Sequence, residues 1–113
     1  MMIITITSIR LKSLWHFFKL SLLGLRIVKQ TKTEKGFVRM KNTGFGYMHY
    51  TLSVWESEED VKRFARTGAH ARAMQQSKNI ATEIRTYTYS SNQLPSWKQV
   101  KQLLKEKGNA HTF

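Results

Sequence analysis

The order in which extended and helical patterns follow one another constrains this chain more than any other feature. Segments rich in β-branched residues, or alternating between apolar and polar ones, predict strands at 2–9, 36–42, 46–55 and 81–90. Apolar residues at three- and four-residue spacings predict helices at 13–30, from Ser57 to about residue 66, and at 69–77. The order β-α-β-β-α-β predicts an α+β, ferredoxin-like antiparallel sheet with helices on one face.

Residues 91–113 form a linker and a C-terminal helix that follow this domain, which spans 1–90. The segment SNQLPS reads as the linker, and a basic amphipathic helix runs from Ser96 to Lys107 and ends at Gly108. The tail with His111 is expected to be frayed. If the other helices leave one sheet face bare, a second copy of the chain is the simplest cover, so we expect a homodimer. The sequence leaves open whether the terminal helix covers its own subunit or its neighbour.

Two local patterns give sharper expectations. Ser57 and an acid three residues later have capping-box spacing, with two more acids in the first turn, which predicts that the helix begins there. In the helix at 13–30, Lys12, Lys19 and Arg26 mark a solvated stripe. The apolar residues expected to face the core are Leu11, Leu14, Phe18, Leu22, Leu25 and Val28.

Composition excludes several kinds of chemistry. The chain has no cysteine, so disulfides and thiolate catalysis are excluded. Its four histidines lie in four different predicted elements without ligand spacing, so no metal site is expected. Lys19 and Arg26 interrupt the apolar stretch around residues 14–28, which is too short to span a membrane, and no signal-cleavage pattern follows. A cytoplasmic location is therefore predicted.

The net charge of +12 favours an anionic partner, and residues 1–33 contain no Asp or Glu. Because the basic residues are scattered over every segment, solubility and general anion attraction are favoured over nucleic-acid binding. The alternative is a basic surface for nucleic acid or anionic lipid. Its residues would be Lys12, Lys19, Arg26, Lys98, Lys101 and Lys105.

The strand at 46–55 presents two different faces to its surroundings. Met48, Tyr50, Leu52 and Val54 point to one side, which is apolar. The opposite side is mixed, and it carries Tyr47, His49, Thr51, Ser53 and Trp55. The mixed face is equally compatible with a ligand cavity and with a subunit interface.

His70 follows Thr67-Gly68 and precedes Met74 by one helical turn. On one continuous helix both side chains would face water, whereas a break at Thr67-Gly68 would turn them inward. We expect the break. A histidine placed there either has only a structural hydrogen bond or takes part in a site.

The residues from Val54-Trp55 through ESEEDVKRFARTGAHARAM resemble the dimeric α/β-barrel superfamily of antibiotic-biosynthesis monooxygenases and their haem-degrading relatives. The similarity covers about residues 2–90. The segments ITSIRLKSLWHFFKL and GFVRMKNTGFG resemble spheroidene monooxygenase-like proteins and related uncharacterised bacterial proteins. The resemblance implies a homodimer with a cavity between sheet and helices in each subunit. It also implies either cofactor-free oxidation of phenolic substrates or binding of haem.

Matching Trp55 to the strand-end tryptophan of the haem degraders places Met74 at their ligand histidine and Phe64 at their pocket tryptophan. Residues 2–11 lack their asparagine. Haem degradation by their mechanism is therefore not expected, although axial ligation by His70 or Met74 stays open.

The resemblance implies a monooxygenase-like protein that binds an apolar or aromatic molecule, with haem or no cofactor. His70 would be the ligand or proton-transfer residue, and Met74, Phe64 and Trp55 would line the cavity. Weaker candidates are Thr5, Thr7, Tyr47 and His49. The alternative on the same scaffold is a non-enzymatic ligand-binding or stress-related module.

Overall fold

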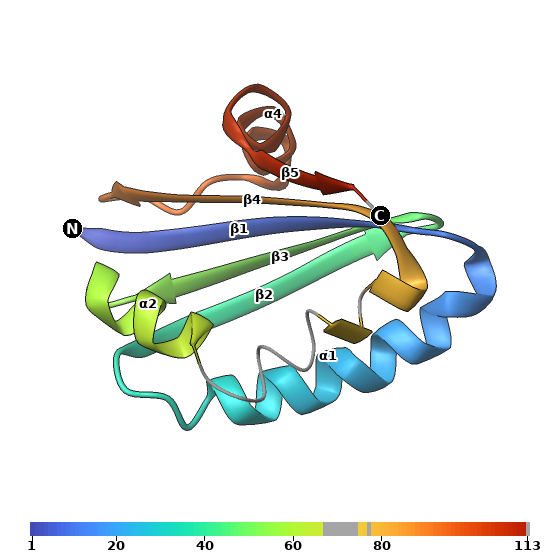
Figure 1. Ribbon diagram of the computed structural model, residues 1–113. Helices are drawn as coiled ribbons and strands as arrows, with labels where there is room; N and C mark the ends of the chain where they lie inside the picture. Colours follow the sequence, from blue (N-terminus) through green and yellow to red (C-terminus); the bar gives the residue numbers. More distant parts are fainter. Residues whose placement is uncertain (67–74, 77, 113) are drawn as a thin grey trace.

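The computed structural model describes residues 1–66, 75–76 and 78–112 of the chain. Five antiparallel strands form one sheet in the order β2-β3-β1-β4-β5 (Figure 1). The strands are β1 (Met2–Leu11), β2 (Phe37–Phe45), β3 (Met48–Trp55), β4 (Ala81–Ser91) and β5 (Asn109–Thr112). The first four have the ferredoxin-like arrangement that the sequence predicts.

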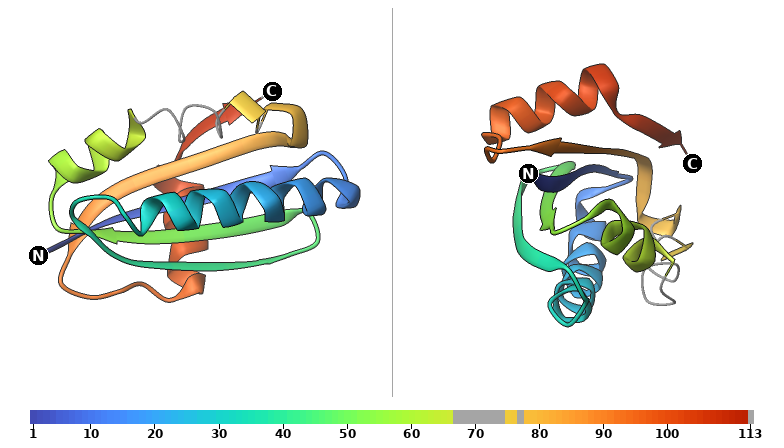
Figure 2. Two further views of the ribbon diagram at one scale, coloured as in Figure 1. Left: turned by 90° about the horizontal axis from the view of Figure 1, so that it is seen from below. Right: turned by 90° about the vertical axis from the view of Figure 1, so that its left-hand side faces the viewer.

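Helices lie on both sides of this sheet. They are the 3-10 turn η1 (Leu14–His16), α1 (Phe17–Thr31), α2 (Glu58–Ala65) and α4 (Trp97–Lys107). Figures 1 and 2 show α1 and α2 on one face, as predicted, and α4 on the other. The expectation that this second face is bare is wrong, because the terminal helix covers it within the same chain. The homodimer stays a prediction.

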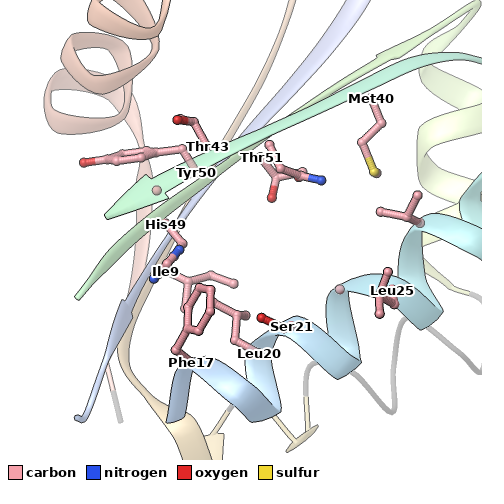
Figure 3. Close-up of a pocket in the computed structure, with 14 residues that line it drawn as sticks. Ile9, Phe17, Leu20, Ser21, Leu25, Met40, Thr43, His49, Tyr50 and Thr51 are labelled. Atoms are coloured by element: carbon pink, nitrogen blue, oxygen red, sulfur yellow. The ribbon is translucent and has the colours of Figure 1, made fainter. Parts of the chain in front are cut away.

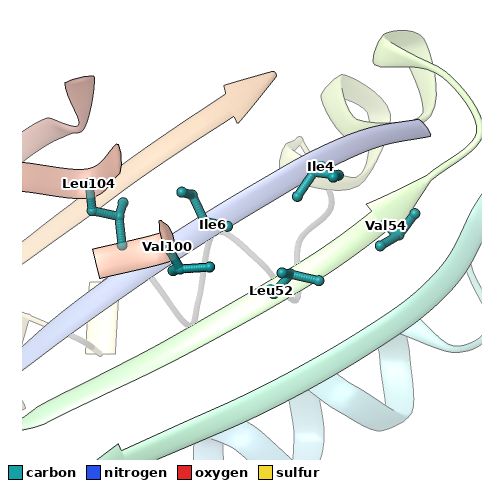
Figure 4. Packing of buried hydrophobic residues seen from close by; sticks show 6 residues of the cluster. All are labelled: Ile4, Ile6, Leu52, Val54, Val100 and Leu104. Atoms are coloured by element: carbon teal, nitrogen blue, oxygen red, sulfur yellow. The ribbon is translucent and has the colours of Figure 1, made fainter. Parts of the chain in front are cut away.

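The buried core lies between α4 and the apolar sheet face. Ile4 and Ile6 pair in register with Val54 and Leu52, so these four aliphatic side chains share one face. Val100 and Leu104 of α4 complete the cluster, and all six residues are buried (Figure 4). Ser96 and Gln99 form a reciprocal capping box where α4 begins.

The C-terminal tail is a strand, and the expectation of fraying is wrong. In β5, Asn109 pairs with Thr86 and His111 pairs with Ile84. At Gly108 the backbone is extended, and its N–H still donates to the carbonyl of Leu104 at 3.0 Å. The chain therefore turns directly from helix into strand, so β5 ties the end of α4 to its own sheet.

The hairpin between β2 and β3 is tighter than predicted. The sequence suggests a turn over residues 42–46, but Asn42 to Phe45 continue β2 and pair with Thr51 to Met48. Gly46, with φ +62°, and Tyr47 form the two-residue connection. A positive φ in a two-residue hairpin turn favours glycine, and this requirement places the turn.

The predicted start of α2 is confirmed. The Ser57 hydroxyl accepts a hydrogen bond from the Asp60 backbone N–H at 3.2 Å and donates one to its Oδ2 at 2.8 Å. Arg63 donates to Asp60 Oδ1 at 2.9 Å. Gly36, with φ +84°, lies against the Asp60 side chain so closely that a Cβ there would overlap the carboxylate. This contact ties the loop after α1 to the start of α2.

The predicted inward face is wrong at four of its six positions, whereas Leu11 is buried and Val28 lines the space between α1 and the sheet. Leu14 of η1 and Phe18, Leu22 and Leu25 of α1 are all exposed. Apolar residues occupy well over half of the α1 circumference, so their spacing alone does not select one face. The side turned toward the sheet contains the small residues Ser21 and Gly24.

Candidate ligand cavity

A cavity of about 610 Å³ separates α1 from the sheet. Its helical wall includes Phe17, Leu20, Gly24 and Val28. Its other wall comes from β1, β2 and β3 and includes Ile9, Met40, His49 and Thr51. Figure 3 shows Met40 and Thr51 projecting from the strands toward α1, with Phe17 beside His49 at one end. The walls are mainly apolar, with a few polar groups among them.

The hollow exists because the facing side chains are too small to fill it. Apart from its chain neighbours and the backbone of α1, no atom of the described residues lies within 4 Å of a Cβ added to Gly24. Ser21, one turn before it, also lines the space. A helix whose central inward residues are Ser and Gly leaves room for a guest between itself and the sheet.

The mixed face of the sheet is the one that borders this cavity. Ile9 and His49 pair in register, as do Thr7 and Thr51, and Ile9, His49 and Thr51 line the space. The Tyr50 ring belongs to the opposite face, where Lys101 Nζ of α4 lies 5.3 Å from its centre. Of the two interpretations of the mixed face, this geometry favours the ligand cavity.

His49 is the titratable side chain that reaches the cavity. Its Nε2 lies 3.0 Å from the carbonyl oxygen of Gly46. Because a carbonyl only accepts, Nε2 carries a proton, and Nδ1 of the neutral ring holds a lone pair. The Phe17 ring lies 5.4 Å away between centroids. The imidazole occupies the space that a Cβ on Gly44 would need, so the glycine allows this ring position.

Hydroxyl groups extend the polar part of the mixed face beyond the cavity. Ser53, Thr5 and Thr88 form one cross-strand row. Thr51, Thr7 and Thr86 form the next row. Thr5 and Thr88 hydroxyls are hydrogen bonded at 2.9 Å. The two rows are continuous with the cavity at Thr51.

The aromatic candidates Trp55 and Phe64 lie elsewhere. Their ring centroids are 5.1 Å apart, and Phe37 packs against Trp55 at 5.8 Å. Trp55 Nε1 donates to Ser53 Oγ at 2.9 Å, and the indole is fully buried beside α2. Both rings take part in packing and do not line the cavity under α1.

Five other predicted residues are distributed as follows. His70 and Met74 lie outside the described residues, so their role in a site stays a prediction. Thr5 and Thr7 belong to the hydroxyl rows. Tyr47 is exposed in the hairpin turn.

Sequence reasoning ranked His49 low and did not find Phe17, Ser21, Gly24 or Met40. One signal was present, because a glycine in mid-helix costs about 1 kcal/mol relative to alanine and so often has a packing or functional reason. Gly24 is that glycine. Met40 had no comparable signal, since its strand position is ordinary.

The cavity does not have the donors of a haem site. Among the described lining residues there is a single imidazole, and its Nε2–H is donated to the Gly46 carbonyl. No lysine or arginine in the described lining is available for the propionates. Within the described part of the chain, no three His, Asp or Glu side chains lie close enough to hold a metal ion. None of the described helices combines the length and apolarity needed to cross a bilayer.

No protein-family model matches the sequence, and no curated protein matches it at a significant level. Solved structures do match. An antibiotic biosynthesis monooxygenase-like protein from Nitrosomonas europaea has a TM-score of 0.75 at 11% identity, over 84% of this chain and 94% of that one. SnoaB, a cofactor-independent oxygenase from Streptomyces nogalater, has a TM-score of 0.70 at 13% identity, over 84% and 98%. A conserved protein from Methanosarcina mazei Go1 has a TM-score of 0.74 at 13% identity, over 80% and 93%.

Proposed function

We propose that this protein, which has the ferredoxin-like fold of the antibiotic biosynthesis monooxygenase-like proteins, binds a small aromatic molecule with a phenolic hydroxyl under α1. We further propose that it oxidises this molecule with dioxygen. The single observation that carries the proposal is the apolar cavity with one imidazole at its end. The likeness in fold to a cofactor-independent oxygenase supports the choice of chemistry.

The cavity walls suit an aromatic guest. Leu20, Val28 and Ile9 offer apolar surface, and Phe17 offers a ring edge or face. Polar groups at Ser21, Asn42 and Thr51 are few, which suits a ligand whose polar atoms are also few. The lining therefore favours a ligand that is mainly apolar and that makes one or two hydrogen bonds.

His49 would move the proton. Its Nδ1 accepts the proton of the phenolic hydroxyl, and the resulting phenolate is electron-rich enough to be oxidised by dioxygen. For an anthrone-type substrate, whose enol tautomer carries the phenolic hydroxyl, the net reaction with dioxygen breaks the two C–H bonds of the ring methylene of the keto form, and one oxygen atom becomes the new carbonyl. The second oxygen atom leaves with both hydrogens as water. His70 stays a second candidate for this proton transfer.

Binding is tested with Gly24→Phe, which places a ring in the hollow. Because no described residue outside α1 meets a Cβ at Gly24, we expect the variant to keep its fold and to show at least about a tenfold loss of affinity in calorimetric titration with 1-naphthol or anthrone. The matched control is Leu22→Phe, which adds the same ring to the exposed side of the same helix. Equal affinity of Gly24→Phe and the wild type would refute a ligand site under α1.

Oxidation is tested with His49→Gln. The glutamine amide can still donate to Gly46, but it cannot take a proton at pH 7. We expect oxygen uptake with anthrone to fall about 100-fold or more while anthrone affinity is unchanged. Uptake that survives in His49→Gln but not in His70→Ala would move the role to His70. Tight binding without any oxygen uptake would favour the non-enzymatic ligand-binding module.

A further inference from the structure

The outer side of η1 and α1 exposes an unusual amount of apolar surface. Trp15 is 81% exposed, Phe18 66%, Leu22 61% and Leu25 69%. At 100° per residue, the last three fall within about 60° of the helix circumference and lie away from the cavity-facing Gly24. We call Trp15, Phe18, Leu22 and Leu25 the outer stripe. Contiguous exposed apolar side chains of this size mark an interaction surface.

Cations border this stripe without any acid. Lys29 falls within the same sector of the helix, and Lys19 and Arg26 lie on its flank, at most about 60° from Leu22. All three side chains are exposed. Residues 1–33 contain six Lys or Arg and no Asp or Glu. The surface therefore combines apolar side chains of the kind that insert into a membrane interface with positive charges that no acid in residues 1–33 balances.

We propose that the outer stripe docks the protein on a lipid bilayer with anionic headgroups. The aromatic and leucine side chains enter the boundary between headgroups and acyl chains, and Lys19, Arg26 and Lys29 contact lipid phosphates. This pairing of a Trp/Phe/Leu face with a basic flank on one helix is the physical requirement for lying in a membrane interface.

Two other occupants fit less well. A second copy seated on the stripe by a two-fold axis would bring α1 against α1, with cations opposing cations and no acid on either helix to pair with them. A nucleic acid would use the cations, but Leu22 and Leu25 offer it neither stacking nor hydrogen bonds. The bilayer uses both the charge and the aliphatic surface.

Docking in this way would connect the bilayer with the cavity. Leu25 is part of the stripe and also lines the cavity, so the two surfaces meet at its side chain. An apolar guest dissolved in the bilayer would reach the cavity at this edge without crossing water. This route rests on the proposed function, whereas the docking itself does not.

Docking is tested by flotation of the full chain with vesicles of phosphatidylcholine alone or mixed with phosphatidylglycerol, at low salt. We expect binding to the mixed vesicles only. Phe18→Ser combined with Leu22→Ser should weaken it at least about tenfold, and Lys19→Gln combined with Arg26→Gln by about tenfold. The charge-matched control is Lys98→Gln with Lys105→Gln on α4, which should bind as the wild type does.

Trp15 supplies a second readout. Its emission should shift to the blue on the mixed vesicles, and Trp15→Phe should abolish the shift, because Trp55 is buried and Trp97 of α4 packs against the core on the other side of the sheet. No flotation with the mixed vesicles would overturn the proposal, as would flotation that the Ser pair leaves unchanged. A concentration-dependent dimer that the Ser pair dissociates, without flotation, would assign the stripe to a second copy. None of these assays contains the aromatic guest, so they succeed or fail independently of the cavity experiments.

Discussion

The two faces of the sheet are covered by basic amphipathic helices, yet only one of the two interfaces is filled. On the α4 side, Val100 and Leu104 are buried among aliphatic strand residues. On the α1 side, Phe18 and Leu22 face outward, and a cavity separates the helix from the strands. Although both helices are basic and amphipathic, α4 packs closely against the sheet, whereas α1 forms one wall of a cavity.

The difference lies in the residues that meet across each gap. Alternation places Ile4, Ile6, Leu52 and Val54 under α4, and these match its apolar positions. The face under α1 has hydroxyls and an imidazole, and the helix meets it with Ser21 and Gly24. The aliphatic cluster thus fills the space under α4, whereas the space under α1 is left open and could hold a ligand.

The largest expected effect concerns the filled face. Leu104→Ala should lower the free energy of unfolding by about 3 kcal/mol, because it leaves a cavity in a packed cluster. Leu20→Ala, which removes the same atoms beside an existing hollow, should cost about 1 kcal/mol. Urea denaturation followed by circular dichroism measures both. Equal losses would mean that the two interfaces are equally well packed in solution.

The element order and the α2 cap could be predicted, because each depends on local pattern. Ser57 and its acids identify a helix start from a few residues alone. The two faces of β3 also follow from alternation. What could not be predicted depends on contacts between distant segments. Asn109 to Thr112 carry no strong strand pattern, and they become a strand only because the edge of β4 is free to pair with them.

The site was less predictable than the fold for a related reason. The chain marks His49 only as one residue of a mixed face, and its position in the cavity depends on the tight turn at Gly46 and on the space over Gly44. The orientation of α1 was missed because leucines and phenylalanines surround most of the helix. Periodicity identifies a helix with such a composition, but it does not identify the face that turns inward.

A gain of stability should come from the open face. Gly24→Ala should raise the free energy of unfolding by about 1 kcal/mol, because alanine is the better helix former and its methyl group meets no described residue outside α1 within 4 Å. Denaturation midpoints in urea measure the gain. The control is Gly108→Ala, where the new Cβ would overlap the Leu104 carbonyl oxygen on the α4 side, so a loss is expected. A loss at Gly24 as well would show that α1 sits closer to the sheet in solution.

A smaller effect concerns a charged residue at the edge of the interface between α4 and the sheet. Lys101→Gln should lower the free energy of unfolding by about 0.5 kcal/mol, because it removes the ammonium that lies over the Tyr50 ring. Lys29→Gln on the outer side of α1 should change it by about zero, since that side chain is exposed on the helix surface. Thermal unfolding in parallel samples measures the pair. A larger loss at Lys29 than at Lys101 would indicate that α1 has a partner.

The smallest expected effect is that of low pH, which should lower the local stability of α2 alone. The Ser57 hydroxyl, and then Arg63, hold the pKa of Asp60 below its ordinary value of about 3.9. The folded protein therefore binds this proton more weakly than the unfolded chain does. The stabilisation is complete above about pH 5 and is lost as the pH falls through the lowered pKa. Because Asp60 joins the start of α2 to Gly36, we expect hydrogen-exchange protection of α2 amides to fall with acid before that of α4 amides. In Asp60→Asn, which has no proton to bind at this position, the two helices should lose protection together. If α4 amides lost protection first in the wild type, Asp60 would not be the group through which acid first weakens the fold.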